Sequence, residues 1–140
     1  MATVQSTSTA PLTGRWPQNP LSVPLARQEL RAALAAWGRA DLADAAELVL
    51  SELMTNALRH AADCGWEIET RVELDGDGVR LEVHDASDAR PHMRVAGDED
   101  DGGRGLGLVD AITGHRWGVL TDLRSGKSVW ALVGGGAGDP

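Results

Sequence analysis

The stretch that decides the fold is DLADAAELVLSELMTNALRHA, which spans residues 41–61. On a helical wheel at about 100° per residue, its apolar positions form one stripe, made of Leu42, Ala46, Val49, Leu53 and Ala57. Such a stripe has to be buried against another layer of structure. We therefore expect a helix that begins at a capping Asp41, reaches about His60 and packs on a sheet.

Polar residues border this stripe on one side. Asn56 falls at the edge of the stripe, Glu52 lies further out, and Arg59 lies beyond Glu52. In a cleft, the amide oxygen of Asn56 suits Mg²⁺, the carboxylate of Glu52 can accept a proton, and Arg59 can bind phosphate. The alternative is a solvated helix flank, because Glu-x-x-x-Asn is a common spacing. His60 falls near the middle of the stripe, which favours a packed histidine over a metal ligand.

The remaining periodicities predict an α+β domain. A first helix is expected from about Ser22 to Trp37, in a hairpin with the helix that follows it. Alternating segments predict two strand hairpins separated by a short helix at 106–112; the strands are 66–74 with 79–84, and 117–122 with 127–133. This order predicts a two-layer α/β sandwich, with helices on one face of a mixed, largely antiparallel sheet. Residues 1–20 are expected to be a disordered arm, 21–133 the domain, and 134–140 a flexible tail.

Composition limits the classes of function. The chain of 140 residues is long enough for one domain, and its net charge of −8 argues against a face that binds nucleic acid directly. The sequence has no apolar run near the roughly 20 residues that span a bilayer, and its N-terminus does not resemble a signal peptide. A single cysteine, Cys64, favours a reducing compartment. We expect a cytoplasmic protein that does not bind membranes.

Asp85 ends a strand in which it shares a face with Val79, Leu81 and Val83. A carboxylate that points toward a core needs a partner, because an unpaired buried polar group costs roughly 1–3 kcal/mol or more. An adenine amino group is a suitable donor, and Ser87 could assist directly or through water. The alternative is a turn-initiating Asp at the end of a strand.

A glycine-rich segment, Gly103-Arg104-Gly105-Leu106-Gly107, precedes and opens a later helix. Backbone N–H groups and the positive end of a helix can hold phosphate at such a place. The segment differs from the dinucleotide fingerprint, because Leu108 occupies the third glycine position. The alternative is a flexible loop that ends in a helix cap.

The order of these motifs resembles the GHKL ATPase superfamily, which includes gyrase, the Hsp90 chaperone, histidine kinases and MutL. The resemblance rests on the helical Glu-x-x-x-Asn, the strand-end Asp85-x-Ser87, a long loop and the Gly-Arg-Gly-Leu-Gly-Leu of residues 103–108. The resemblance covers about Ser22 to Val133. Within this superfamily, the sequence most resembles the small anti-sigma-factor serine kinases of bacteria.

This resemblance implies a role for each motif. Residues 51–61 match the N box of the family, with Glu52 as the general base and Asn56 as the Mg²⁺ ligand. Asp85 would bind the adenine amino group, with Thr121 or Ser128 near the base. The glycine-rich segment, from Gly103 to Gly107, would flank the triphosphate under a mobile lid. In the first glycine box, this sequence carries Ser87 where the family often has glycine.

Three functions follow from the resemblance. In the first, the protein uses ATP and Mg²⁺ to phosphorylate a serine on an anti-sigma-factor antagonist, and it can also sequester a sigma factor. In the second, ATP occupancy sets the choice of protein partner without phosphotransfer. In the third, the domain is structural and its site is degenerate. The resemblance leaves a homodimer open.

Overall fold

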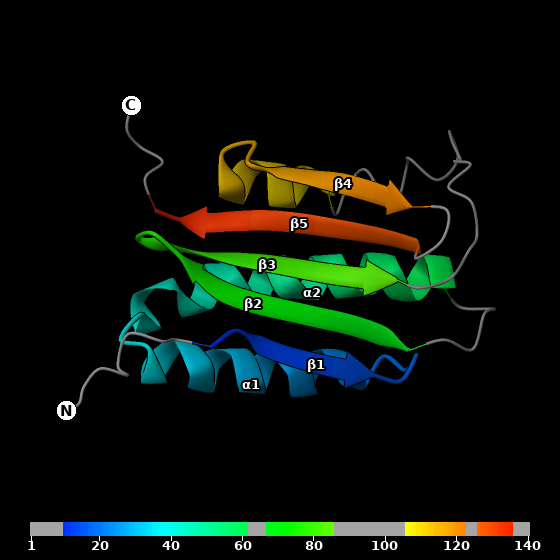
Figure 1. The fold of residues 1–140 in the computed structure, drawn as a ribbon, viewed down its shortest axis with the longest axis horizontal. Helices are drawn as coiled ribbons and strands as arrows, with labels where there is room; N and C mark the ends of the chain where they lie inside the picture. Colours follow the sequence, from blue (N-terminus) through cyan, green and yellow to red (C-terminus); the bar gives the residue numbers. More distant parts are fainter. Residues whose placement is uncertain (1–9, 62–66, 86–105, 123–125, 136–140) are drawn as a thin grey trace.

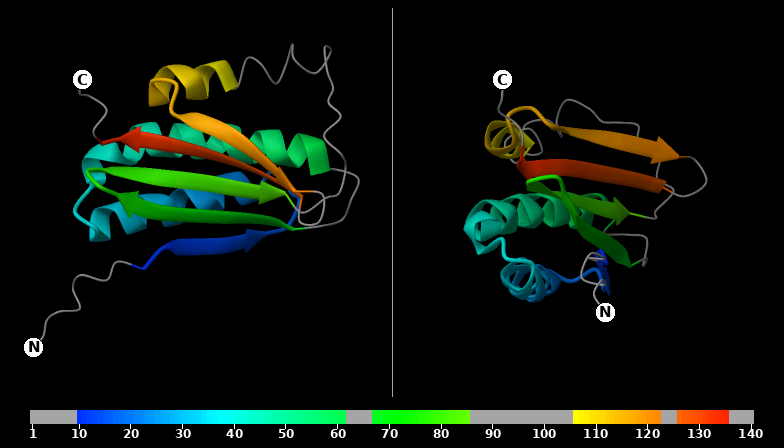
Figure 2. Two further views of the ribbon diagram at one scale, coloured as in Figure 1. Left: turned by 45° about the horizontal axis from the view of Figure 1, so that its top comes forward. Right: turned by 60° about the vertical axis from the view of Figure 1, so that its left-hand side comes forward.

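The computed structural model describes residues 10–61, 67–85, 106–122 and 126–135. These residues form the expected α+β sandwich, in which helices cover one face of a five-stranded sheet (Figures 1 and 2). Several residues to which the sequence assigned a role lie outside the described ranges: Cys64, Ser87, Gly103, Arg104 and Gly105. Their assigned roles stay predictions.

The helical layer consists of α1 (Ser22–Ala36), the short 3-10 helix η2 (Ala40–Leu42) and α2 (Ala43–Ala61). The two α-helices agree with the predicted ones to within about two residues. The expected cap at Asp41 is wrong, because Asp41 lies inside η2 and its carboxylate accepts hydrogen bonds from the guanidinium of Arg39 at 3.0 Å. This hydrogen bond lowers the pKa of Asp41.

The central sheet consists of β1 (Leu12–Trp16), β2 (Ile68–Asp75), β3 (Gly78–Asp85), β4 (Trp117–Asp122) and β5 (Gly126–Gly134). Their order across the sheet is β1-β2-β3-β5-β4, and each of the four neighbouring pairs is antiparallel. The described sheet is therefore antiparallel throughout, which agrees with the expectation of a largely antiparallel sheet. Gly76, at φ +60°, provides the left-handed backbone that the tight β2–β3 turn requires.

The strand β1 corrects the prediction of a disordered arm over residues 1–20. Leu12 to Trp16 pair with β2, and the indole N–H of Trp16 donates to the hydroxyl of Thr70 at 2.9 Å. Arg15 forms an ion pair with Glu69 across the same two strands at 3.1 Å. The prolines at 11 and 17 suggested an irregular segment, but they lie just outside a short edge strand, a position that proline tolerates.

The core lies between α2 and the sheet, and α2 packs mainly on β3. Four of the five positions in the predicted stripe are confirmed, since Ala46, Val49 and Leu53 are fully buried and Ala57 nearly so. The fifth, Leu42, lies in η2 and is partly buried against the core. One buried acid joins the helices: Glu47, 7 % exposed, forms ion pairs with Arg27 and Arg31 of α1. Among the described residues, no helix is long and apolar enough to cross a membrane.

Residues 106–113 are helical, as expected, and their C-terminal end is tied to β4. The carboxylate of Asp110 accepts a hydrogen bond from the indole N–H of Trp117 at 2.8 Å and lies 2.8 Å from Nδ1 of His115. Hydrogen bonding to His115 first, and then to Trp117, lowers the pKa of Asp110. The guanidinium of Arg116 donates to the carbonyl oxygens of Thr113 and Gly134. These contacts fix this helix against the sheet.

Candidate functional site

Three polar residues form the last row of side chains on the helix-covered face of the sheet. Asp85 of β3 lies opposite Lys127 of β5, and Lys127 lies opposite Thr121 of β4. Directly paired residues in an antiparallel sheet project from the same face. Asp85 is only 2 % exposed, so it points toward the core as its strand phase predicts. The neighbouring row is apolar, with Val83, Val129 and Val119.

The C-terminal half of α2 reaches this same end of the sheet (Figure 1). At the opposite end, Arg39 donates to the carbonyl of Asp77, and the Leu42 side chain lies against Gly134. From there α2 and β3 advance together. Asn56 lies roughly 20 Å along α2 from its first residue at about 1.5 Å per residue. Asp85 lies roughly 23 Å along β3 at about 3.3 Å per residue. Asn56 and Asp85 are therefore level with one another.

The polar flank of α2 shows the predicted gradient of exposure. Asn56 is 9 % exposed, Glu52 is half-buried and Arg59 is exposed. The amide oxygen of Asn56 is buried and has no hydrogen-bond partner within the described parts of the chain. By contrast, buried Glu47 has arginine cations beside its carboxylate. An orphaned buried oxygen calls for an explanation, and a donor or a cation supplies one.

Part of the glycine-rich segment lies within the described residues. Leu106 packs against the core, whereas Gly107 is exposed. A Cβ added at Gly107 would meet no described atom within 4 Å. Packing among the described residues therefore does not require glycine at this position.

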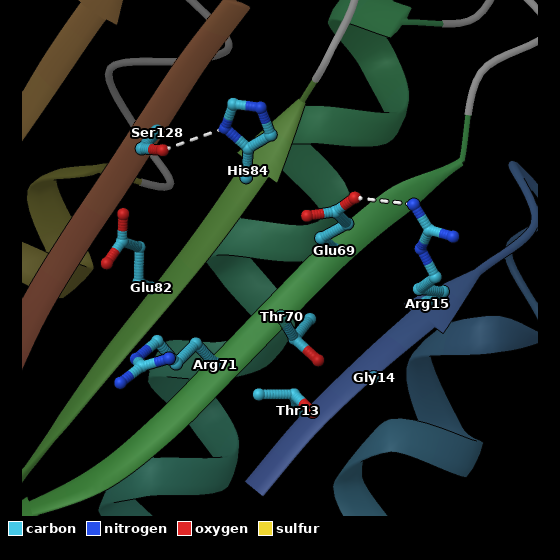
Figure 3. A pocket seen from close by; sticks show the side chains of 9 residues that line it. All are labelled: Thr13, Gly14, Arg15, Glu69, Thr70, Arg71, Glu82, His84 and Ser128. Atoms are coloured by element: carbon cyan, nitrogen blue, oxygen red, sulfur yellow. Dashed lines mark hydrogen bonds and ion pairs between the residues drawn. The ribbon is translucent and has the colours of Figure 1, made fainter. Parts of the chain in front are cut away.

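Ser128 does not lie with the other residues assigned to the site. It is paired with His84 and Leu120, one position out of phase with Asp85, so its side chain projects from the open face of the sheet. There its hydroxyl lies 2.9 Å from Nδ1 of His84 (Figure 3). Thr121, by contrast, shares the face of Asp85. The structure therefore places Ser128 on the opposite face from Asp85, whereas Thr121 lies on the same face as Asp85, two strands away across Lys127.

The open face carries a polar groove of about 640 Å³ (Figure 3). Residues of four strands line it: Thr13, Gly14, Arg15, Glu69, Thr70, Arg71, Glu82, His84 and Ser128. The charged side chains in this groove have ion-pair partners: Arg15 pairs with Glu69 inside the groove, whereas Arg71 and Glu82 pair with Glu73 and Arg80 outside it. Burial opposes ionisation of Glu82, but hydrogen bonds with Arg80 and Ser128 lower its pKa. The sheet separates this groove from Asn56, so we do not assign the nucleotide to it.

One residue of the row, Lys127, was not among the predicted site residues. The signal was present in the sequence, because Lys127 is in phase with the buried Val129, Ala131 and Val133 of β5. A lysine in the apolar phase of a strand points toward the same layer as the core residues. Its neighbour across the sheet could not be read from the sequence, since β3 pairs with β5 and not with β4.

Comparison with known proteins identifies the family of the chain. A search among curated proteins finds no match. A family model described as the histidine kinase-like ATPase domain matches residues 16–116, which is well over half of the chain. The match includes α2 and β3, which carry Asn56 and Asp85, and the sandwich is consistent with a domain of this type. The chain belongs to the histidine kinase-like ATPase family.

Proposed function

We propose that the protein binds ATP with Mg²⁺ at the Asn56–Asp85 end of the helix-covered sheet face and phosphorylates a serine or threonine on a partner protein. One observation carries the proposal. A nearly fully buried carboxylate and a buried amide oxygen with no hydrogen-bond partner among the described residues lie level with each other on the same side of the sheet. Membership in the histidine kinase-like ATPase family supports ATP as the ligand.

In this proposal, the adenine ring of ATP binds beside the row of Asp85, Lys127 and Thr121 at the end of the sheet. The buried carboxylate of Asp85 accepts a hydrogen bond from the adenine amino group, and Thr121 lies in the same row. Ser87 is assigned to the same subsite. A buried ionised acid accepts hydrogen bonds and rejects other acceptors, so it selects for an amino group.

The phosphates extend from the base toward α2 and the glycine-rich segment. The orphaned oxygen of Asn56 fits the preference of Mg²⁺ for oxygen ligands, and the ion would neutralise charge on the phosphates. We assign the backbone N–H groups from Gly103 to Gly107, together with Arg104 and Leu106, to the triphosphate. Arg59, exposed on the same flank of α2, is a further phosphate ligand.

Glu52 acts as the general base. The hydroxyl oxygen of a partner serine attacks the γ-phosphorus while the bond from that phosphorus to the β–γ bridging oxygen breaks. ADP leaves with the electron pair, and the hydroxyl proton passes to the carboxylate of Glu52. Its half-buried position on α2 leaves this carboxylate accessible to a partner side chain. The partner that we propose is an anti-sigma-factor antagonist, with a sigma factor as a second protein bound without chemistry.

A second candidate function is an ATP-dependent partner switch that transfers no phosphate. The contrast in burial favours it: Asn56 and Asp85 are buried as binding residues should be, whereas Glu52 is only half-buried. In this alternative, nucleotide occupancy alone determines which partner binds.

The test combines nucleotide binding with phosphate transfer. ATP affinity is measured by calorimetry with and without Mg²⁺, and transfer from γ-labelled ATP is followed on candidate antagonist proteins. Asp85→Asn should weaken binding, while Glu52→Gln should preserve binding and abolish transfer. Transfer that survives in Glu52→Gln would show that Glu52 is not the base. A wild-type protein that binds ATP and transfers to none of the partners it binds supports the switch.

A further inference from the structure

Lys127 lies next to Asp85, the carboxylate that binds the adenine ring in the proposed function. It is the register partner of Asp85, and paired residues on neighbouring strands have Cα atoms about 4.5–5.5 Å apart. Both side chains project from the helix-covered face. Lys127 is half-buried, and Thr121 lies on its other side. The ammonium group of Lys127 is thus placed beside the carboxylate that is proposed to bind the adenine ring.

The chemistry of the two groups is complementary. An ionised carboxylate only accepts hydrogen bonds, and an ammonium only donates them. A carboxylate has about four acceptor positions and an ammonium has three N–H groups, so each can keep a protein partner and still bind a ligand. The row therefore offers an acceptor and a donor side by side to whichever base edge reaches it.

The two common purines present opposite groups at position 6. Adenine carries an amino donor there and an acceptor at N1, whereas guanine carries a keto acceptor at position 6 and N–H donors at positions 1 and 2. Asp85 alone satisfies the amino group of adenine and repels the keto oxygen of guanine. With Lys127 beside it, the keto oxygen also finds a donor, and the guanine N–H groups find Asp85.

We propose that Lys127 is a specificity-determining residue that extends the nucleotide site from 6-amino to 6-keto purines, so that the protein binds GTP as well as ATP. This inference rests on the proposed nucleotide site. It concerns the choice of base, and ATP and GTP share the same triphosphate, so the ratio of their affinities isolates the part played by Lys127 from the phosphate contacts.

The experiment measures the dissociation constants of ATP, GTP and ITP for the full chain in the presence of Mg²⁺. Wild type should bind GTP within about tenfold of ATP. Lys127→Met keeps the length of the side chain and removes the donor, and a hydrogen bond to a charged group is worth roughly 1.5–3 kcal/mol, or about ten- to hundredfold in affinity. In this variant the ratio of GTP affinity to ATP affinity should fall by about tenfold or more. The ratio of ITP affinity to ATP affinity should fall as well.

Matched variants separate this effect from general changes of charge. Lys127→Arg keeps a donor and should keep GTP binding, whereas Asp85→Asn gains a donor and should shift the ratio toward GTP. Arg71→Met removes a cation from the opposite face of the sheet and should leave the ratio unchanged. Thermal unfolding confirms that each variant is folded.

The outcomes distinguish this inference from the proposed function. If wild type binds ATP but rejects GTP by more than about hundredfold, or if Lys127→Met leaves the ratio unchanged, the role of Lys127 is refuted while the ATP site stands. If wild type binds no purine nucleotide, the site itself is refuted, and the role of Lys127 with it.

Discussion

Replacement of Asn56 by leucine should stabilise the protein while it abolishes the response to Mg²⁺. The Asn56 amide oxygen is buried, and it has no hydrogen-bond partner among the residues that the structure describes. An unsatisfied buried acceptor costs roughly 1–3 kcal/mol. Asn56→Leu removes that oxygen and continues the apolar surface of Leu53 and Ala57. We therefore expect unfolding to become about 1–3 kcal/mol less favourable, on top of the gain in helix propensity.

Thr55→Leu is the control for that propensity. Thr55 is exposed on the same turn of α2, and leucine is the better helix former at both positions by roughly half a kcal/mol. The difference between the two variants in urea denaturation isolates the burial term. Each kcal/mol of this difference in unfolding free energy should raise the melting temperature by about 4 °C for a domain of this size.

Ligand binding provides the second measurement on the same variants. MgATP should raise the melting temperature of wild type and of Thr55→Leu, because a ligand that binds the folded state stabilises it. It should raise that of Asn56→Leu no more than ATP with EDTA does. Asn56→Asp, which keeps an oxygen at the site, should be less stable than wild type without Mg²⁺ and should recover with it. If Asn56→Leu is less stable than wild type by about 1 kcal/mol or more, the oxygen has a partner in solution and the argument fails.

Three further predictions test contacts that hold the fold together. Hydrogen bonds with His115 and Trp117 lower the pKa of Asp110. Its contribution to stability is therefore complete above the unfolded pKa of about 3.8 and is lost as the pH falls through the lower folded value. In melting curves from pH 7 to pH 2, the melting temperature of Asp110→Asn should fall less than that of wild type. Gly78→Ala should destabilise by about 1–3 kcal/mol in urea, because its Cβ would lie 2.6 Å from a backbone oxygen of β5, and an unchanged midpoint would show that β5 shifts freely. Trp16→Phe should cost about 1 kcal/mol by loss of the 2.9 Å hydrogen bond to a buried hydroxyl of β2, and a neutral result would mean that β1 is not held by it.

The parts of the fold that were predictable depend on local periodicity. The stripe of α2 and the alternation in β3 and β5 follow from the positions of apolar residues, which is why their bounds agree with the structure to within about two residues. The strand β1 was missed because five residues between prolines carry little periodic signal. Its stability comes from pairing with β2 and from the Trp16 side chain, and both are contacts with distant residues.

The candidate site shows the same division. Strand phase correctly placed Asp85 on the buried side, and the wheel correctly ordered Asn56, Glu52 and Arg59 by exposure. The phase of β5 also shows that Ser128 faces away from the core and that Lys127 lies on the same face as Asp85. By contrast, the pairing of β3 with β5 skips β4, so the row that joins Asp85 to Lys127 depends on a crossover that local patterns do not encode.

The position of the polar residues is itself an argument for a binding site. Asn56, Asp85 and Lys127 each occupy a position in the apolar phase of its own element, α2, β3 or β5. Buried polar side chains also occur elsewhere among the described residues, but those have protein partners, such as Glu47 with Arg27 and Arg31. The amide oxygen of Asn56 differs from them, because it is buried and has no hydrogen-bond partner among the described residues. A ligand that brings a donor or a cation to this end of the sheet would satisfy that oxygen. Departures of this kind from the folding pattern are expected at functional sites, because a site is selected for binding at the expense of stability.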